Sequence, residues 1–212
     1  DENAWVRYTP DGENSETATF TFRSWDQTTG TASSGTTARY ADTTTNGTTT
    51  AYSTTTASGS QAVTAVNDAP VVDLDGSAGG ITYSSSFSAG GSAVTIADSD
   101  GTVSDVDSGD QIESLSATLT SRPDGDGAES LSLDATATTA AAALTVTYTE
   151  ATGVLSITGA ASASTYQTIL RGIQYDNSDA AANITTGNRT VNVVVNDGDS
   201  NATTAAATVS VV

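Results

Sequence analysis

Short β-forming runs, separated by turn residues, follow one another from Pro70 to the last residue. A run such as "VNVVVN" (191–196) is rich in valine, which favours a strand. Gly and Asp mark the turns, as in "PDGDG" (123–127) and "NDGDSN" (196–201). We predict strands at 70–74, 81–87, 92–97, 112–120, 129–134, 143–149, 153–158, 172–176, 189–196 and 203–212. Short strands at such close spacing predict an all-β sandwich.

One segment departs from this pattern. The stretch "SASTYQTILRGI" (162–173) has Tyr166, Ile169, Leu170 and Ile173 at helical spacing, so we predict a helical turn there.

The residues before Pro70 supply fewer strands. We predict these at 4–9, 17–25 and 60–66, and a long loop or irregular hairpin in the Thr- and Ser-rich stretch 26–59. So few strands cannot bury two sheet faces or cover their own edges. We therefore expect two modules: the C-terminal part of a sandwich at 1–68 and a complete sandwich at 69–212.

Charge and composition exclude several classes of function. The 25 acidic residues against six arginines give a net charge of −19, which argues against nucleic-acid binding, because phosphate neutralisation needs a basic patch. No run approaches the ~20 apolar residues of a membrane span. A chain this acidic either tolerates its self-repulsion or relieves it with cations, and Ca²⁺ is then the natural candidate, since carboxylates are hard oxygen ligands.

Catalysis is not expected. His, Cys and Met are absent, which removes zinc sites, disulfides and the usual nucleophile and base pairs. A carboxylate-pair glycosidase needs a cleft lined with aromatic residues, and aromatic residues make up only 6% of the chain. We predict that the protein is not an enzyme.

Several stretches resemble a known family. "TATFTFRSWDQTTG" followed by "SGSQAVTAVNDAP" resembles the end of a cadherin-like repeat and its linker, and "TVSDVDSGDQIESLSATLT" (102–120) resembles the segment that follows such a linker. "VNVVVNDGDS" (191–200) resembles the matching strand and its calcium-binding aspartate. The chain as a whole is similar to the tandem cadherin-like repeats of large bacterial surface proteins and repeats-in-toxin-type adhesins. This implies antiparallel Greek-key sandwiches, immunoglobulin-like in architecture, arranged in tandem.

The resemblance also implies a calcium site at the linker. Its ligands would be Asn67, Asp68, Asp105, Asp107 and Asp197. Such a joint stiffens the connection between repeats, because three segments remote in sequence share one ion. The alternative is a set of Asx turns and solvated loop tips that bind no ion. Ala65, Ala69 and Ala89 replace residues that often bind calcium in the family, which implies fewer ions than a full cadherin joint.

Other acidic residues are weaker candidates. They are Asp73, Asp75, Asp98 and Asp100, as a second ion site near the same pole, Asp26 at an upstream joint, and Asp199. Each also suits a strand-end turn. Asp124 and Asp126 in "PDGDG" are expected in a tight turn.

These features predict a calcium-stiffened extender repeat of an extracellular or cell-surface adhesin, which supports adhesion and biofilm formation by projecting a distal tip. Its partners would be neighbouring repeats of the same chain. Two alternatives remain open. One is a fibre subunit assembled by β-strand complementation, with "TTAAATVSVV" (203–212) as a donor strand. The other is a glycan-binding surface module, since Trp5 and Trp25 can stack on a sugar ring.

Overall fold

The computed structural model describes residues 6–12, 14–33, 37, 39–107, 109 and 111–212. The chain divides into two compact units, Asp1–Val66 and Asn67–Val212. The division falls two residues before the boundary expected from the sequence, so the linker residues Asn67 and Asp68 belong to the second unit.

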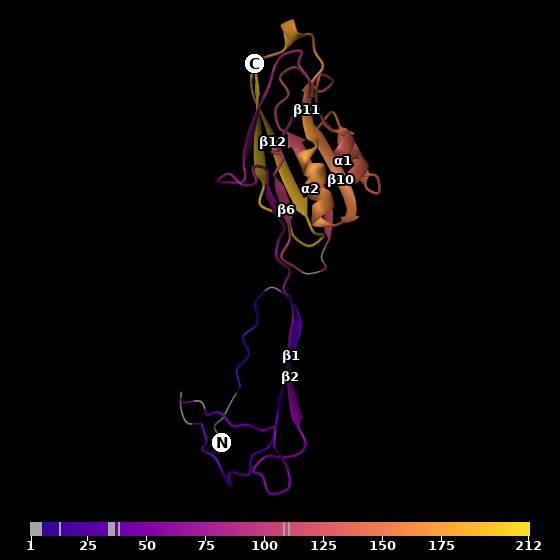
Figure 1. The fold of residues 1–212 in the computed structure, drawn as a ribbon. Coiled ribbons are helices and arrows are strands. Elements are labelled where there is room, and N and C mark those ends of the chain that lie inside the picture. Colours follow the sequence, from indigo (N-terminus) through magenta and orange to yellow (C-terminus); the bar gives the residue numbers. More distant parts are fainter. Residues whose placement is uncertain (1–5, 13, 34–36, 38, 108, 110) are drawn as a thin grey trace. The chain divides into compact units, whose positions relative to one another are not determined.

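The second unit is a β-sandwich (Figure 1). One sheet has six strands in the order β4-β13-β12-β7-β10-β9, and the other has three in the order β5-β11-β8. The strands of the larger sheet are β4 (Tyr83–Phe87), β7 (Ile112–Leu119), β9 (Thr145–Thr149), β10 (Val154–Ala161), β12 (Gly187–Asn196) and β13 (Ala205–Val211). Those of the smaller sheet are β5 (Val94–Thr95), β8 (Glu129–Leu133) and β11 (Ile173–Asn177). The all-β prediction is confirmed.

Residue alternation decides which side chains form the core between the sheets. In β12, every second residue from Arg189 to Val195 is buried, and β13 repeats the pattern from Ala205 to Val211. The two sheets meet where the ring of Phe87 in β4 contacts that of Tyr175 in β11 edge-on, with centroids 5.3 Å apart. The buried faces of the two sheets therefore pack against each other and form the core.

One ladder differs from the antiparallel expectation. β4 and β13 run parallel, with Tyr83 opposite Ala207 and Phe87 opposite Val211. A parallel pair requires a long connection, and here almost the whole second unit lies between the two strands. The same ladder bears on the proposed donor strand, because β13 is also paired with β12 along its other edge.

Two helices and a short ladder complete the unit. α2 (Ala163–Arg171) agrees with the predicted helical turn, and it starts where the Ser162 side chain accepts a bond from the Thr165 N–H. α1 (Ala135–Ala140) and β6 (Thr102–Ser104) were not predicted; β6 pairs with β3 (Val71–Asp73), and a 3₁₀ turn, η1, spans Ala181–Asn183. The Thr/Ala-rich sequence of α1 has no apolar stripe, so its position against α2 and its Asp134 cap define it.

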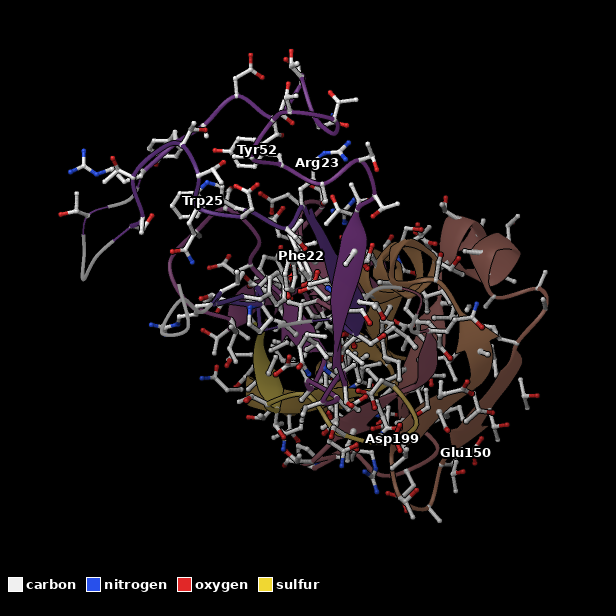
Figure 2. All side chains as sticks on the ribbon, turned by 90° about the horizontal axis from the view of Figure 1, so that it is seen from below. Phe22, Arg23, Trp25, Tyr52, Glu150 and Asp199 are labelled. Atoms are coloured by element: carbon white, nitrogen blue, oxygen red, sulfur yellow. The ribbon has the colours of Figure 1, made fainter. Side chains whose placement is uncertain are left out.

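The first unit has a two-stranded antiparallel sheet, β1 (Glu16–Phe22) and β2 (Ala57–Val63). Beyond the sheet, Trp25 and Tyr52 form an isolated antiparallel bridge (Figure 2). Residues 6–9 are not a strand, contrary to the prediction for 4–9, and residues 4 and 5 lie outside the described part of the chain. Phe20 and Phe22 are 44% and 48% exposed, because the described residues of this unit include no second sheet to cover them.

Candidate metal centre

Three segments meet at the pole of the sandwich where the second unit begins. The linker residue Asn67 donates its side-chain amide to Asp197 Oδ2 at 3.1 Å, in the loop after β12. The next residue, Asp68, donates its backbone N–H to Asp107 Oδ2 at 2.7 Å, in the loop after β6. The structure thus brings the linker against both loops that the sequence singled out.

The loop after β6 is closed by an Asx turn. Asp105 Oδ1 accepts from the backbone N–H of Asp107 at 3.0 Å, which fixes the backbone of this loop. Both side chains are partly buried. Asp107 Oδ1 is fully buried, and none of the described residues donates a hydrogen bond to it. A buried carboxylate oxygen without a donor is costly unless something else balances its charge.

The loop after β12 is organised by a second carboxylate. Asp197 Oδ1 accepts from the backbone N–H groups of Asp199 at 2.8 Å and Ser200 at 2.6 Å. Burial raises the pKa of Asp197, but the hydrogen bonds from Ser200 and Asn67 outweigh it and hold the pKa below its ordinary value. Asp197 is therefore charged at neutral pH. Asp199 itself is exposed.

The donor set suits a hard cation such as Ca²⁺. Carboxylate oxygens come from two loops and a side-chain amide comes from the linker, and none of the described residues donates a hydrogen bond to the buried Oδ1 of Asp107. Within that part of the chain, however, no three acidic side chains form a ready metal cluster. The five predicted ligands are thus linked by hydrogen bonds, and the Asn67 amide and the Asp68 N–H occupy carboxylate oxygens that a cation would compete for.

The weaker candidates are arranged differently. Asp73 Oδ1 accepts from the N–H groups of Asp75 and Gly76, and Asp98 Oδ1 accepts from that of Asp100. These four aspartates gather at the Asp73–Thr102 end of the β3–β6 ladder, whereas Asp105 follows its other end. They form strand-end turns there, and a second ion at these residues stays a prediction.

A hydroxyl completes this second group of turns. Ser77 donates both its hydroxyl and its N–H to Asp100 Oδ2, at 2.6 and 3.1 Å. These bonds, led by the hydroxyl, lower the pKa of Asp100. Asp26, in the first unit, likewise accepts from the N–H and hydroxyl of Thr28, which lower its pKa. Both carboxylates already have donors that satisfy an Asx turn without an ion.

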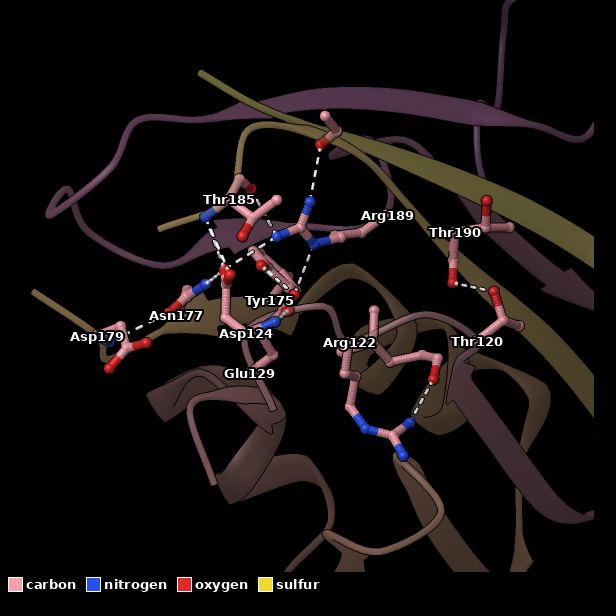
Figure 3. A network of polar contacts seen from close by, with 12 residues as sticks. Thr120, Arg122, Asp124, Glu129, Tyr175, Asn177, Asp179, Thr185, Arg189 and Thr190 are labelled. Atoms are coloured by element: carbon pink, nitrogen blue, oxygen red, sulfur yellow. Dashed lines mark hydrogen bonds and ion pairs between the residues drawn. The ribbon is translucent and has the colours of Figure 1, made fainter. Parts of the chain in front are cut away.

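A buried polar network at the opposite end of β12 was missed by the sequence analysis (Figure 3). Arg189 donates to Glu129 Oε2 at 2.7 Å and to Asp124 Oδ2 at 3.1 Å. Tyr175 also donates to Glu129, and Asn177 to Asp124. The partners are 46 to 65 positions apart, so no local spacing signals the network. It fixes the "PDGDG" turn to the sheet.

Comparisons with known proteins add no further constraint. Neither family models nor curated protein sequences gave a match to this chain. None of the helices in the described residues has the length and apolar character needed to cross a membrane.

Proposed function

We propose that this chain is a calcium-stiffened extender repeat of an extracellular bacterial adhesin or surface protein. In this proposal its modules belong to a tandem series of cadherin-like Greek-key sandwiches, and it acts without catalysis. It supports adhesion and biofilm formation indirectly, by holding a distal tip away from the cell. Its partners are the neighbouring repeats.

One observation carries the proposal. Consecutive linker residues, Asn67 and Asp68, are bonded to two different loops of the same pole, at Asp197 and Asp107. A linker tied at two points rotates less freely than one that only leaves the domain. A cation would stabilise the joint most at the buried Oδ1 of Asp107, because none of the described residues donates a hydrogen bond to this charged oxygen.

In this proposal Ca²⁺ converts a hydrogen-bonded joint into a rigid one. Asp105, Asp107, Asp68 and Asp197 would supply carboxylate oxygens, and Asn67 would turn its amide oxygen toward the ion. The bound ion would offset the repulsion between these carboxylates in a chain of net charge −19. Each added joint would then contribute to the length and stiffness of the array.

Thermal unfolding with excess Ca²⁺ and then with a chelator tests the proposal. At 100 times its Kd, an ion bound only by the folded state adds about 2.7 kcal/mol, which raises the Tm by roughly 5–10 °C for a domain of this size. The Asp105→Asn/Asp107→Asn double variant should lose this rise. The control is Asp126→Asn/Glu150→Gln, which removes the same charge from exposed side chains and should keep it. A calcium-independent Tm in the wild type would refute the ion clamp.

A fibre subunit is the second candidate, favoured by the exposed Phe20 and Phe22 on a sheet of two strands. Strand addition from another molecule would cover these rings. The segment 203–212 is a poor donor, since β13 is paired along both edges. Sedimentation over a range of protein concentrations tests this candidate: a Phe20→Ser/Phe22→Ser variant should lose self-association, and a wild type that stays monomeric would exclude it.

A further inference from the structure

The pair formed by Trp25 and Tyr52 is a firmly held feature of the first unit. Asp26 donates its N–H to the Ala51 carbonyl, and Ser53 to the Ser24 carbonyl, each at 3.0 Å. The indole Nε1–H of Trp25 donates to the Thr29 carbonyl at 2.7 Å, which fixes the ring. Both aromatic side chains nevertheless remain partly exposed (Figure 2).

Two hollows border this aromatic pair. The first has a volume of about 220 Å³ and is also lined by Gly30, Arg39 and Tyr40. A Cβ at Gly30 would lie 3.6 Å from Trp25 Cζ2, so a side chain there would begin to fill the hollow, and the φ of +95° at Gly30 further favours glycine. The second hollow, of about 340 Å³, lies against the same two rings and includes Thr48.

Backbone strain is concentrated around the same pair. Among the described residues, only Gln27 and Thr48 have a positive φ without being glycine, at 64° and 46°. Thr48 is β-branched, for which this conformation is a genuine outlier. Such strain is found preferentially at ligand sites, where the surrounding structure enforces it.

The side chains at the rim of the first hollow are solvent-exposed and can contact a ligand. Tyr40 is 94% exposed, so its ring is presented to solvent rather than to a core. The Arg39 guanidinium makes no hydrogen bond or ion pair in the part of the chain that the structure describes. Although the chain has 25 acidic residues, the described residues lining this hollow include no carboxylate. An uncompensated guanidinium beside aromatic rings is a receptor for an anion with an apolar face.

We propose that this hollow binds a sugar acid, a pyranose ring that carries a carboxylate. The apolar C–H face of the ring lies against Trp25 and Tyr52, and the carboxylate is bound by the Arg39 fork. Tyr40 covers the ring from the solvent side. A volume near 220 Å³ is small for a drug-sized ligand, and it suits a single sugar ring at the end or within a polymer. This function is separate from the calcium joint, which lies in the second unit.

NMR titration of the full chain tests the proposal, with the indole N–H of Trp25 as the reporter. Glucuronic acid should shift this signal saturably, with a Kd of about 1 mM for one sugar ring. Glucose lacks the carboxylate and should bind roughly tenfold more weakly, and acetate lacks the ring and should not shift the signal. If none of the three probes gives a saturable shift at concentrations well above that value, the proposal is wrong.

Variants separate recognition from folding. Tyr40→Ala removes an exposed ring, so it should leave the fold intact and lower the affinity for glucuronic acid roughly tenfold. Arg39→Ala should bind glucuronic acid and glucose equally. Arg7→Ala, which removes the same charge elsewhere in the unit, should bind as the wild type does. Unchanged affinity for glucuronic acid in both Tyr40→Ala and Arg39→Ala would overturn the assignment of the hollow.

Discussion

The side-chain amide of Asn67 lies 3.1 Å from Asp197 Oδ2, and so joins residues that are 130 positions apart. The contact connects the first residue of the second unit to the loop that follows β12. It holds the start of the second unit against this loop.

Asp197→Ala should destabilise the second unit by about 1 kcal/mol, because Asn67, Asp199 and Ser200 all lose an acceptor in a partly exposed loop. Urea unfolding in chelator measures this effect without any contribution from calcium. Asp199→Ala is the matched control: it removes the same charge from an exposed side chain two residues away, and it should change the free energy of unfolding by less than about 0.5 kcal/mol. Equal effects would mean that only charge matters in this loop.

Arg189→Met should cost about 3–5 kcal/mol, because it leaves Glu129 and Asp124 buried without their cation. The side chains of both acids are at most 2% exposed. The comparison is Asp126→Ala, which breaks the ion pair with Arg122, where the acid is 53% exposed, and should cost less than about 1 kcal/mol. Chemical denaturation measures both variants. An Arg189→Met variant as stable as Asp126→Ala would show that the network is not needed for stability.

Acid should destabilise the fold partly through Asp124. Burial raises the pKa of Asp124, but hydrogen bonds from Thr185 and Asn177 and the charge of Arg189 outweigh it and hold the pKa below its ordinary value of 3.8. The unfolded chain therefore takes up a proton first as the pH falls. The stability that this carboxylate contributes is complete above 3.8 and is lost as the pH falls through the lower folded value.

Urea midpoints between neutral pH and the acid limb measure this dependence. Asp124→Asn should be less stable at neutral pH and should lose less stability on acidification than the wild type. The stability of Asp124→Asn should still fall to some extent on acidification, because the pKa of Asp197 is also lowered in the folded protein. If the urea midpoints of the wild type and Asp124→Asn fall equally with pH, Asp124 does not contribute to the acid sensitivity.

Gly172→Ala should destabilise the protein by about 1–3 kcal/mol through overpacking. A Cβ at Gly172 would lie 2.5 Å from both the Ala137 Cβ and the Asp134 Oδ1, where α1 meets the end of α2. Gly79→Ala is the control, because a Cβ there would have no neighbour within 4 Å. Thermal unfolding of the pair gives the difference, and equal Tm values would mean that the helices separate without cost.

Local sequence patterns predicted much of the second unit. The strands predicted at 189–196 and 203–212 match β12 and β13, and the helical spacing of Tyr166, Ile169 and Leu170 matches α2. These patterns are reliable because one buried face imposes a period of 2 on a strand and of 3.6 on a helix. Patterns of this kind were absent from α1 and β6, which depend on neighbours distant in sequence.

The sequence predicted which residues form the linker cluster, but it did not predict how they contact one another. Asn67, Asp68, Asp105, Asp107 and Asp197 were chosen for their residue types and for a resemblance. Their hydrogen bonds, and the separation of Asp73 and its neighbours from them, follow from the register of the β3–β6 ladder. Whether Ca²⁺ binds there stays a prediction.

The sequence by itself determined the β-rich fold, the position of the linker and the acidic loops, because these depend on neighbours within a few residues. Only the tertiary structure decided the parallel β4–β13 ladder, the burial of Arg189 against Glu129, and the hollow beside Trp25 and Tyr52. Each of these joins residues separated by tens of positions, and their contact is set by how the whole chain packs, which no local period records.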